Sequence, residues 1–403
     1  MQTITFDFYS TLVLMVLVLL LGSFIMARVK VLRTYNIPEA VVGGIIAAAL
    51  FLCLRLFGDI KLVFDGSLKD PLMLAFFSSI GLLADFASLK KGGKRLFIFL
   101  IIISVLLVIQ NTVGIGIAKL LGENGLIGLL AGSITMSGGH GTGAAWAGVF
   151  AEDPYNFKGA MEVAMASATF GLVVGGIIGG PVAGYLIKKH DLHTPHKTKG
   201  ELPPITELEN TKERRITQNS FIESLALLAI CLLGGIFIAD FVKGLEFGFT
   251  LPTFVYCLFI GVILRNGLSA LRIHEVFDHE VGLLGNVSLA LFLAFALMSI
   301  DLVQLVSLAL PIFSILFVQT IIMILFAIFV TFRFCGRDYD AAVLSAGHCG
   351  FGLGATPTAM VNMQAVCKHH GMSHTAFIIV PLCGAFFIDL INAVVINGFL
   401  GLF

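Results

Sequence analysis

Residues 133–146 read SITMSGGHGTGAAW, and residues 346–362 read AGHCGFGLGATPTAMVN. Each stretch lies in a longer apolar segment, at about 126–148 and 341–362, and each is crowded with glycine. Glycine destabilises a helix interior by about 1 kcal/mol per residue, so we expect the backbone to unwind at these places. An unwound backbone at membrane depth survives only against protein or around water and ligand. The two segments therefore predict a binding site inside a membrane.

The rest of the sequence has the composition of a membrane protein. Of its 403 residues, 58% are hydrophobic and 12% are charged, whereas soluble domains carry roughly 25% charged residues. Net charge is zero, which gives no basic field for nucleic acid. Ten apolar runs predict transmembrane helices. They lie near 11–27, 38–57, 71–88, 96–121, 160–187, 220–241, 252–268, 281–300, 305–332 and 374–400.

A polar stretch divides these runs into two sets of five. We expect an N-terminal five-helix repeat at 1–187, a solvated linker at 188–219 and a C-terminal five-helix repeat at 220–403. Because five is odd, the second half would enter the membrane from the opposite side. Three sequence matches recur in the same order: 72–76 with 291–295, 139–144 with 350–355, and Pro38 with Pro252. The predicted fold is an all-α polytopic membrane protein of two inverted-topology repeats, each with a glycine-rich broken or re-entrant segment.

The distribution of lysine and arginine predicts the orientation. If the N-terminus lies outside, 19 of the 25 cations fall on the inner face. The six on the outer face are Arg55, Lys61, Lys69, Lys119, Lys158 and Lys243. We therefore expect both termini to be periplasmic and the linker to be cytoplasmic.

The polar groups of the glycine segments are the candidate substrate-binding residues. Freed amides and helix N-termini attract carboxylates, while carbonyl and hydroxyl oxygens can coordinate sodium. The candidates are Ser137, Gly138, Gly139, His140, Gly141, Thr142, Gly350, Gly352, Gly354, Thr356, Thr358 and Asn362. Tight helix packing is the alternative for the glycines, and it is the preferred interpretation for another set in the fifth run. That set is Gly171, Gly175, Gly176, Gly179 and Gly180.

An acidic residue in the last apolar run is the main candidate for binding a cation. Asp389 would coordinate sodium or pair with a substrate ammonium, and Asn392 shares its helical face; a structural carboxylate is the alternative. His140 and His348 could bind a substrate carboxylate or sense pH, although a packed, hydrogen-bonded histidine is the alternative. For other ionisable residues in or near the runs a structural role is preferred over a functional one: Glu39, Asp85, Glu162 and Asp301. The seven cysteines are scattered without a CxxC pair, and no metal cluster or nucleophile–base pair appears. We therefore expect no enzymatic activity and no metal beyond sodium.

These residues alone predict a sodium- or proton-coupled transporter for a small anion. A carrier of another carboxylate such as citrate or malate, a sodium/proton antiporter and a channel remain alternatives. In the transporter interpretation, the third to fifth spans of each half would move against the first and second. We expect an elevator-like shift, with rocking as the alternative.

Several strings resemble the bacterial sodium/glutamate symporter family. The paired glycine motifs at 137–146 and 347–359 are similar to those of the family, as are DPLMLAFF at 70–77, LGNVSL at 284–289 and GAFFID at 384–389. The resemblance covers nearly the whole chain except the linker. It implies two inverted five-helix halves in the lipid of the bacterial inner membrane, with the glycine segments at the binding site. It also implies a homodimer that imports L-glutamate with Na+ as the coupling ion.

Overall fold

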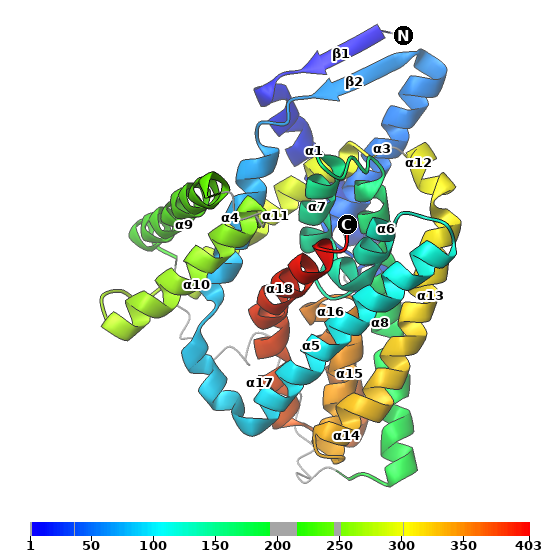
Figure 1. The fold of residues 1–403 in the computed structure, drawn as a ribbon, viewed down its shortest axis with the longest axis vertical. Helices are drawn as coiled ribbons and strands as arrows, with labels where there is room; N and C mark the ends of the chain where they lie inside the picture. The colour runs from blue at the N-terminus through cyan, green and yellow to red at the C-terminus, as the bar shows by residue number, and fades with distance from the viewer. Residues whose placement is uncertain (1, 36, 194–215, 246–250, 301) are drawn as a thin grey trace.

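The computed structural model describes residues 2–35, 37–193, 216–245, 251–300 and 302–403 (Figure 1). Asp301 and most of the predicted linker lie outside the described residues. In the first half the helices are α1 (Phe8–Arg28), α2 (Lys30–Thr34), α3 (Glu39–Gly58), α4 (Lys69–Leu83), α5 (Leu89–Leu120), α6 (Gly125–Leu129), α7 (Gly139–Ala151) and α8 (Ala160–His190). In the second they are α9 (Gln218–Gly244), α10 (Thr253–Leu271), α11 (Asp278–Met298), α12 (Leu302–Ser307), α13 (Ala309–Phe326), α14 (Phe332–Phe334), α15 (Tyr339–Leu353), α16 (Thr356–His370), α17 (His374–Leu382) and α18 (Ile388–Leu400).

All ten predicted apolar runs are helical. Within the described residues, eight helices are long and apolar enough to cross a membrane. The third run forms α4 of only 15 residues, and the tenth is divided into α17, a π-helical stretch at Cys383–Phe387, and α18. Pro381 explains part of the second departure, because proline cannot donate the helical hydrogen bond and an irregular turn follows it.

A short strand pair was not predicted. Strand β1 (Gln2–Phe6) pairs in parallel with β2 (Ile60–Phe64), and the rings of Phe6 and Phe64 lie 5.4 Å apart. The pair connects the start of α1 with the end of α3 (Figure 1). Each strand has only five residues beside a long apolar run, and the pairing joins segments far apart in sequence. Local periodicity therefore gives little signal for it.

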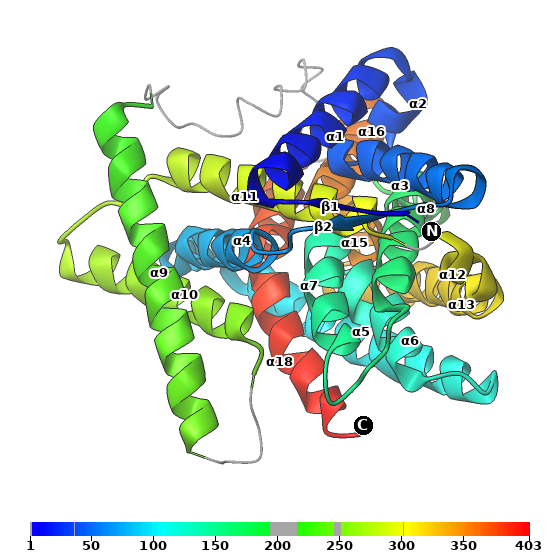
Figure 2. The same ribbon diagram turned by 90° about the horizontal axis from the view of Figure 1, so that it is seen from above.

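The helices form two groups. In the first group α1 packs on α3, α3 on α11, α11 on α4, α4 on α10 and α10 on α9. In Figure 2, α9 lies at the left edge of the molecule and α1 at its top. The second group contains α5 to α8 and α13 to α18, in which α15 packs on α8, α16 and α17, and α5 packs on α6, α13 and α18.

The third spans, α4 and α11, pack with the first group, so the static packing does not support the expectation that they accompany the fourth and fifth spans. Glycine explains this packing. A Cβ added to Gly81 of α4 would lie 2.1 Å from the Leu258 carbonyl oxygen of α10, and one added to Gly285 of α11 would lie 2.0 Å from Ser79 Oγ of α4. These crossings allow the backbones of α4, α10 and α11 to approach closely, which is the role of small residues between membrane helices.

The predicted small-residue face of α8 is confirmed for three of its glycines. Gly171, Gly175 and Gly179 lie against the backbone of α15 or the side chain of Asn362, within 3.1 Å of where a Cβ would stand. Gly180 is different, because nothing lies within 4 Å of its added Cβ. The face therefore fixes α8 against the second glycine segment.

Candidate functional site

Both glycine-rich segments are broken helices, as predicted. In the first, the backbone is non-helical at Gly132, turns at residues 137–138 and enters α7 at Gly139, where φ is +67°. In the second, α15 ends at Leu353, the next two residues are extended or irregular, and α16 begins at Thr356. A positive φ strains any side chain but is open to glycine, so Gly139 allows this sharp re-entry into helix.

The unwound regions are shorter than the glycine-rich stretches at 133–146 and 346–362. Gly141, Gly350 and Gly352 all lie within helices. Packing explains why: a Cβ on Gly141 would lie 2.7 Å from the Phe76 ring, and one on Gly350 would lie 2.4 Å from the Ala359 Cα. These glycines serve tight helix packing, which was the alternative to unwinding. The close contacts they allow stabilise the helices and offset the low helix propensity of glycine.

The match between 139–144 and 350–355 also does not mark equivalent positions. Gly139 follows the first break, whereas Gly350 precedes the second break by several residues. The start of α7 corresponds better to the start of α16 at Thr356.

The two breaks meet. A Cβ on Gly139 would lie 3.4 Å from the Gly354 carbonyl oxygen, so the start of α7 touches the end of α15. Neither α7 nor α16 has a side chain that caps its N-terminus. Helix N-termini carry partial positive charge and free N–H groups, whereas the end of α15 offers carbonyl oxygens. The crossing therefore offers donors for anions and acceptors for a cation within a few ångströms.

The hydroxyl and amide candidates of α16 differ in their partners. Thr356 Oγ1 donates to the Gly384 carbonyl at 2.6 Å, and Asn362 Nδ2 donates to the Gly175 carbonyl at 2.8 Å. Thr358, in the first turn of α16, is 1% exposed, and its hydroxyl has no hydrogen-bond partner among the described residues. Buried polar groups are usually paired. Of the two threonine hydroxyls in α16, that of Thr358 therefore remains free to form a hydrogen bond with a ligand.

The two segment histidines are hydrogen-bonded to threonines. His140 Nε2 lies 3.0 Å from Thr169 Oγ1, whose hydroxyl donates to the Met165 carbonyl, so the imidazole N–H is the donor in this contact. His348 Nδ1 lies 2.8 Å from Thr331 Oγ1 at the end of a π-helical stretch. Three aromatic rings surround His348: Phe99, Phe326 and Phe351. This environment supports a packing role for His348.

Asp389 and Asn392 both reach the first glycine segment, but at different places. Thr142 Oγ1 donates to Asp389 Oδ1 at 3.3 Å, in the first turns of α7. Asn392 exchanges two hydrogen bonds with Ser133, accepting from its hydroxyl at 2.6 Å and donating to its carbonyl at 2.9 Å. The Asn392 amide is thus used to hold α18 on the segment, and Asp389 has the greater remaining capacity to bind a cation.

Three amides beside the crossing were missed by the sequence reasoning. Gln110 of α5 donates to the Gly352 carbonyl at 2.8 Å and accepts from Ser137 Oγ at 2.9 Å. Gln319 of α13 donates to the Gln110 carbonyl at 2.7 Å, and its own side-chain oxygen is buried without a partner among the described residues. Asn111 Oδ1 accepts from the Ser133 amide at 2.9 Å. A neutral amide inside an apolar run could have marked these residues as site candidates, because burying a polar group within the membrane costs free energy.

The crossing is closed in this structure. His140, Thr142, Thr358 and Asn362 are all buried. Two surface pockets of about 460 and 450 Å³ lie elsewhere, one at the loop between α10 and α11 and the other beside α3, β2 and α11. A ligand at the crossing would therefore need the helices to separate first, as in other gated sites.

Broken helices that bring paired backbone ends and buried amides together inside an apolar bundle define a membrane transport protein. The chain belongs to the sodium/glutamate symporter family, whose sequence profile matches residues 4–372. It is 55% identical over 394 residues to the sodium/glutamate symporter of Escherichia coli (strain K12), covering 98% of this chain and 97% of that one. It is 50% identical over 401 residues to the sodium/glutamate symporter of Haemophilus influenzae, with 98% and 97% covered.

Among solved structures, a sodium/proton antiporter of Methanocaldococcus jannaschii aligns with a TM-score of 0.42 and 14% identity. The alignment covers 97% of each chain. A similarity at this level assigns no fold.

Proposed function

We propose that the protein is a secondary transporter that imports L-glutamate across the bacterial inner membrane together with Na+. The observation that carries this proposal is the meeting of the two helix breaks, with uncapped N-termini of α7 and α16. Glutamate has two carboxylates and one ammonium. The two N-termini would bind the carboxylates, Thr358 would donate its unpaired hydroxyl, and Asp389 would pair with the ammonium.

The amide cluster is the favoured place for Na+. Sodium is a hard cation that takes oxygen ligands, as calcium and magnesium do. Three oxygens of suitable kind lie in one hydrogen-bonded cluster: Gln110 Oε1, Ser137 Oγ and the Gly352 carbonyl. Gln319, which donates to the main-chain carbonyl of Gln110, has an unpaired side-chain oxygen among the described residues. Asp389 is the alternative ligand. Because the cluster includes groups from both broken segments, bound Na+ would order the backbone that receives glutamate, and by linkage glutamate would raise the affinity for Na+.

Uptake into proteoliposomes tests the function. An inward Na+ gradient should drive accumulation of labelled L-glutamate, and collapse of that gradient should stop it. Unlabelled citrate and malate should not compete. Uptake driven equally by a proton gradient without Na+, or equal competition by citrate, would exclude the proposed coupling or the proposed substrate.

Replacement of one hydroxyl separates binding from folding. Thr358→Val keeps the shape of the side chain and removes a hydroxyl that no described residue uses, so the melting temperature should not fall. If that hydroxyl binds glutamate, the KM for glutamate should rise about ten- to a hundredfold, since one lost hydrogen bond to a charged group is worth about 1.5–3 kcal/mol. Thr356→Val is the contrast, because its hydroxyl holds Gly384 and its loss should lower the melting temperature. An unchanged KM in Thr358→Val would remove this residue from the site.

We also propose that the halves at 1–187 and 220–403 are inverted repeats joined by the cytoplasmic linker. The helix pairings support this. Packing of α1 on α3 has its counterpart in α9 on α10, and packing of α3 on α11 in α10 on α4. Gln110 and Gln319 occupy matching places in the fourth spans, each three residues after a leucine, at 107 and 316. The fourth and fifth spans with the glycine segments would move, elevator-like, against the first three.

Cysteine labelling in intact cells tests the orientation with periplasmic termini. With the exposed Cys53 replaced by serine, a membrane-impermeant maleimide should label Leu402→Cys and spare Arg333→Cys. The reverse pattern would invert the topology.

A homodimer is proposed from the family resemblance alone. Its test is the molecular mass of the purified protein after subtraction of detergent. A monomer at all concentrations would contradict it.

A further inference from the structure

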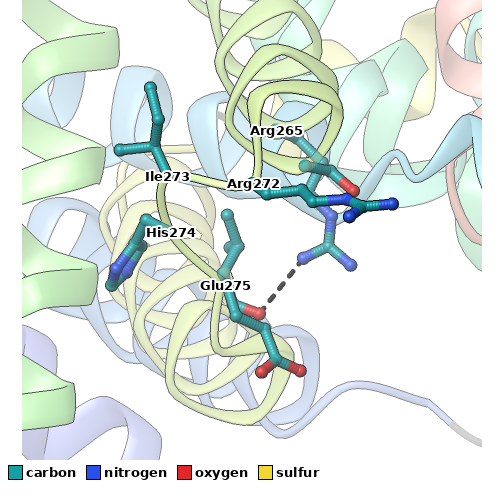
Figure 3. A pocket seen from close by; sticks show the side chains of 7 residues that line it. Arg265, Arg272, Ile273, His274 and Glu275 are labelled. Atoms are coloured by element: carbon teal, nitrogen blue, oxygen red, sulfur yellow. Dashed lines mark hydrogen bonds between the residues drawn. The ribbon is translucent and has the colours of Figure 1, made fainter.

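A pocket lined by two arginines and one glutamate, Arg265, Arg272 and Glu275, opens at the loop between α10 and α11, outside the glycine segments. It has a volume of about 460 Å³, and its polar lining includes Arg265, Ser269 and Arg272 (Figure 3). Nothing in the proposed transport cycle uses these residues. The pocket stands at the end of a helix that is long and apolar enough to span a membrane.

Arg265 is held rigidly at the base of this pocket. Its Nη1 donates to the Val276 carbonyl at 3.2 Å and to Asp278 Oδ1 at 2.5 Å, and its Nη2 donates to Asp278 Oδ2 at 3.4 Å. The carboxylate neutralises the guanidinium and fixes its plane. The remaining N–H groups of Arg265 are still available as donors.

Arg272 carries the uncompensated charge. It ends α10 in the left-handed conformation with φ at 54°, and no residue that the structure describes forms a hydrogen bond or ion pair with its guanidinium. Figure 3 shows its guanidinium on the same side of the loop as that of Arg265, with the Glu275 carboxylate pointing away from it. His274 lies on the other side and pairs with Glu223 of α9 at 3.7 Å.

Large aliphatic side chains flank this cation. Leu271 is 70% exposed and Ile273 is 69% exposed, immediately before and after Arg272. At the end of a membrane span such side chains face acyl chains, while a neighbouring guanidinium reaches the headgroup layer. An apolar rim around an unpaired arginine therefore fits an amphiphilic anion better than a free ion.

We propose that this pocket binds the phosphodiester of an anionic phospholipid. Arg272, the free N–H groups of Arg265 and the Ser269 hydroxyl contact the phosphate, and the acyl chains run along Leu271 and Ile273. Basic pockets beside span ends recognise lipid headgroups in this way, and the orientation proposed above places the pocket at the anionic inner leaflet. The proposal does not depend on the transported substrate.

Native mass spectrometry of the full chain tests the proposal. Purified protein is titrated with phosphatidylglycerol and, separately, with phosphatidylcholine. Phosphatidylglycerol should bind more tightly, and Arg272→Gln should lower its affinity about fivefold, the contribution of one arginine near a charged surface. Arg272→Lys should retain part of the preference. Arg333→Gln is the matched control, because it removes an exposed arginine at the end of another span, and it should leave the affinity unchanged.

Three results would overturn the proposal. The first is equal binding of the two lipids, and the second is an equal loss in Arg272→Gln and Arg333→Gln, which would indicate general surface charge. The third is displacement of phosphatidylglycerol by inorganic phosphate at millimolar concentration, which would make the site one for free phosphate. Thermal unfolding of each variant without lipid verifies that it is folded.

Discussion

Asp389→Asn should abolish Na+-driven glutamate uptake while the protein remains folded. The amide oxygen of asparagine can still accept from Thr142, so the contact between α18 and α7 is kept and only the charge is lost. Removing the Asp389 charge from the apolar interior should not destabilise the protein. The ammonium group of glutamate, however, would lose the carboxylate with which we propose it pairs. Initial rates of uptake in proteoliposomes should fall at least about a hundredfold, since an unpaired buried ammonium costs several kcal/mol.

Asp240→Asn is the matched control, because Asp240 is an exposed aspartate near the end of α9, away from the glycine segments. Its uptake should equal that of the wild type. The melting temperatures of both variants should lie close to the wild-type value. Normal transport by Asp389→Asn would remove this carboxylate from the mechanism and leave the amide cluster as the cation site.

Gly171→Ala should disrupt both stability and transport. The added Cβ would lie 1.9 Å from the Leu353 carbonyl oxygen, at the end of α15 where the second break begins. A backbone oxygen cannot move aside as a flexible side chain can, so α8 and α15 must separate. Overpacking of this kind costs about 1–3 kcal/mol. Thermal unfolding in detergent should show a lower melting temperature, and uptake should be lost because the break is displaced.

Gly180→Ala provides the comparison on the same helix. Nothing lies within 4 Å of its added Cβ, and alanine has the higher helix propensity, so the variant should be as stable as the wild type or slightly more stable. If Gly171→Ala and Gly180→Ala behave alike, the close approach of α8 to α15 does not matter for function.

The sequence alone determined where the helical segments of this protein lie, though not its strand pair. Ten apolar runs became helices, and the two glycine-crowded segments became broken helices. Both outcomes depend on local composition: apolar length sets a span, and glycine or proline weakens a helix where it stands. Asp389 was found for a similar reason, since a carboxylate in an apolar run is unusual enough to be noticed in sequence.

Only the tertiary structure decided which partners these elements meet. It placed α4 and α11 with the first two spans, shortened the unwound regions by packing, and brought Gln110 within hydrogen-bond distance of the Gly352 carbonyl. It also paired the Asn392 side chain with Ser133 through hydrogen bonds and left the Thr358 hydroxyl without a partner among the described residues. Helix crossings are set by side-chain shape between segments that are often far apart in the chain, and one sequence carries no local signal for such contacts.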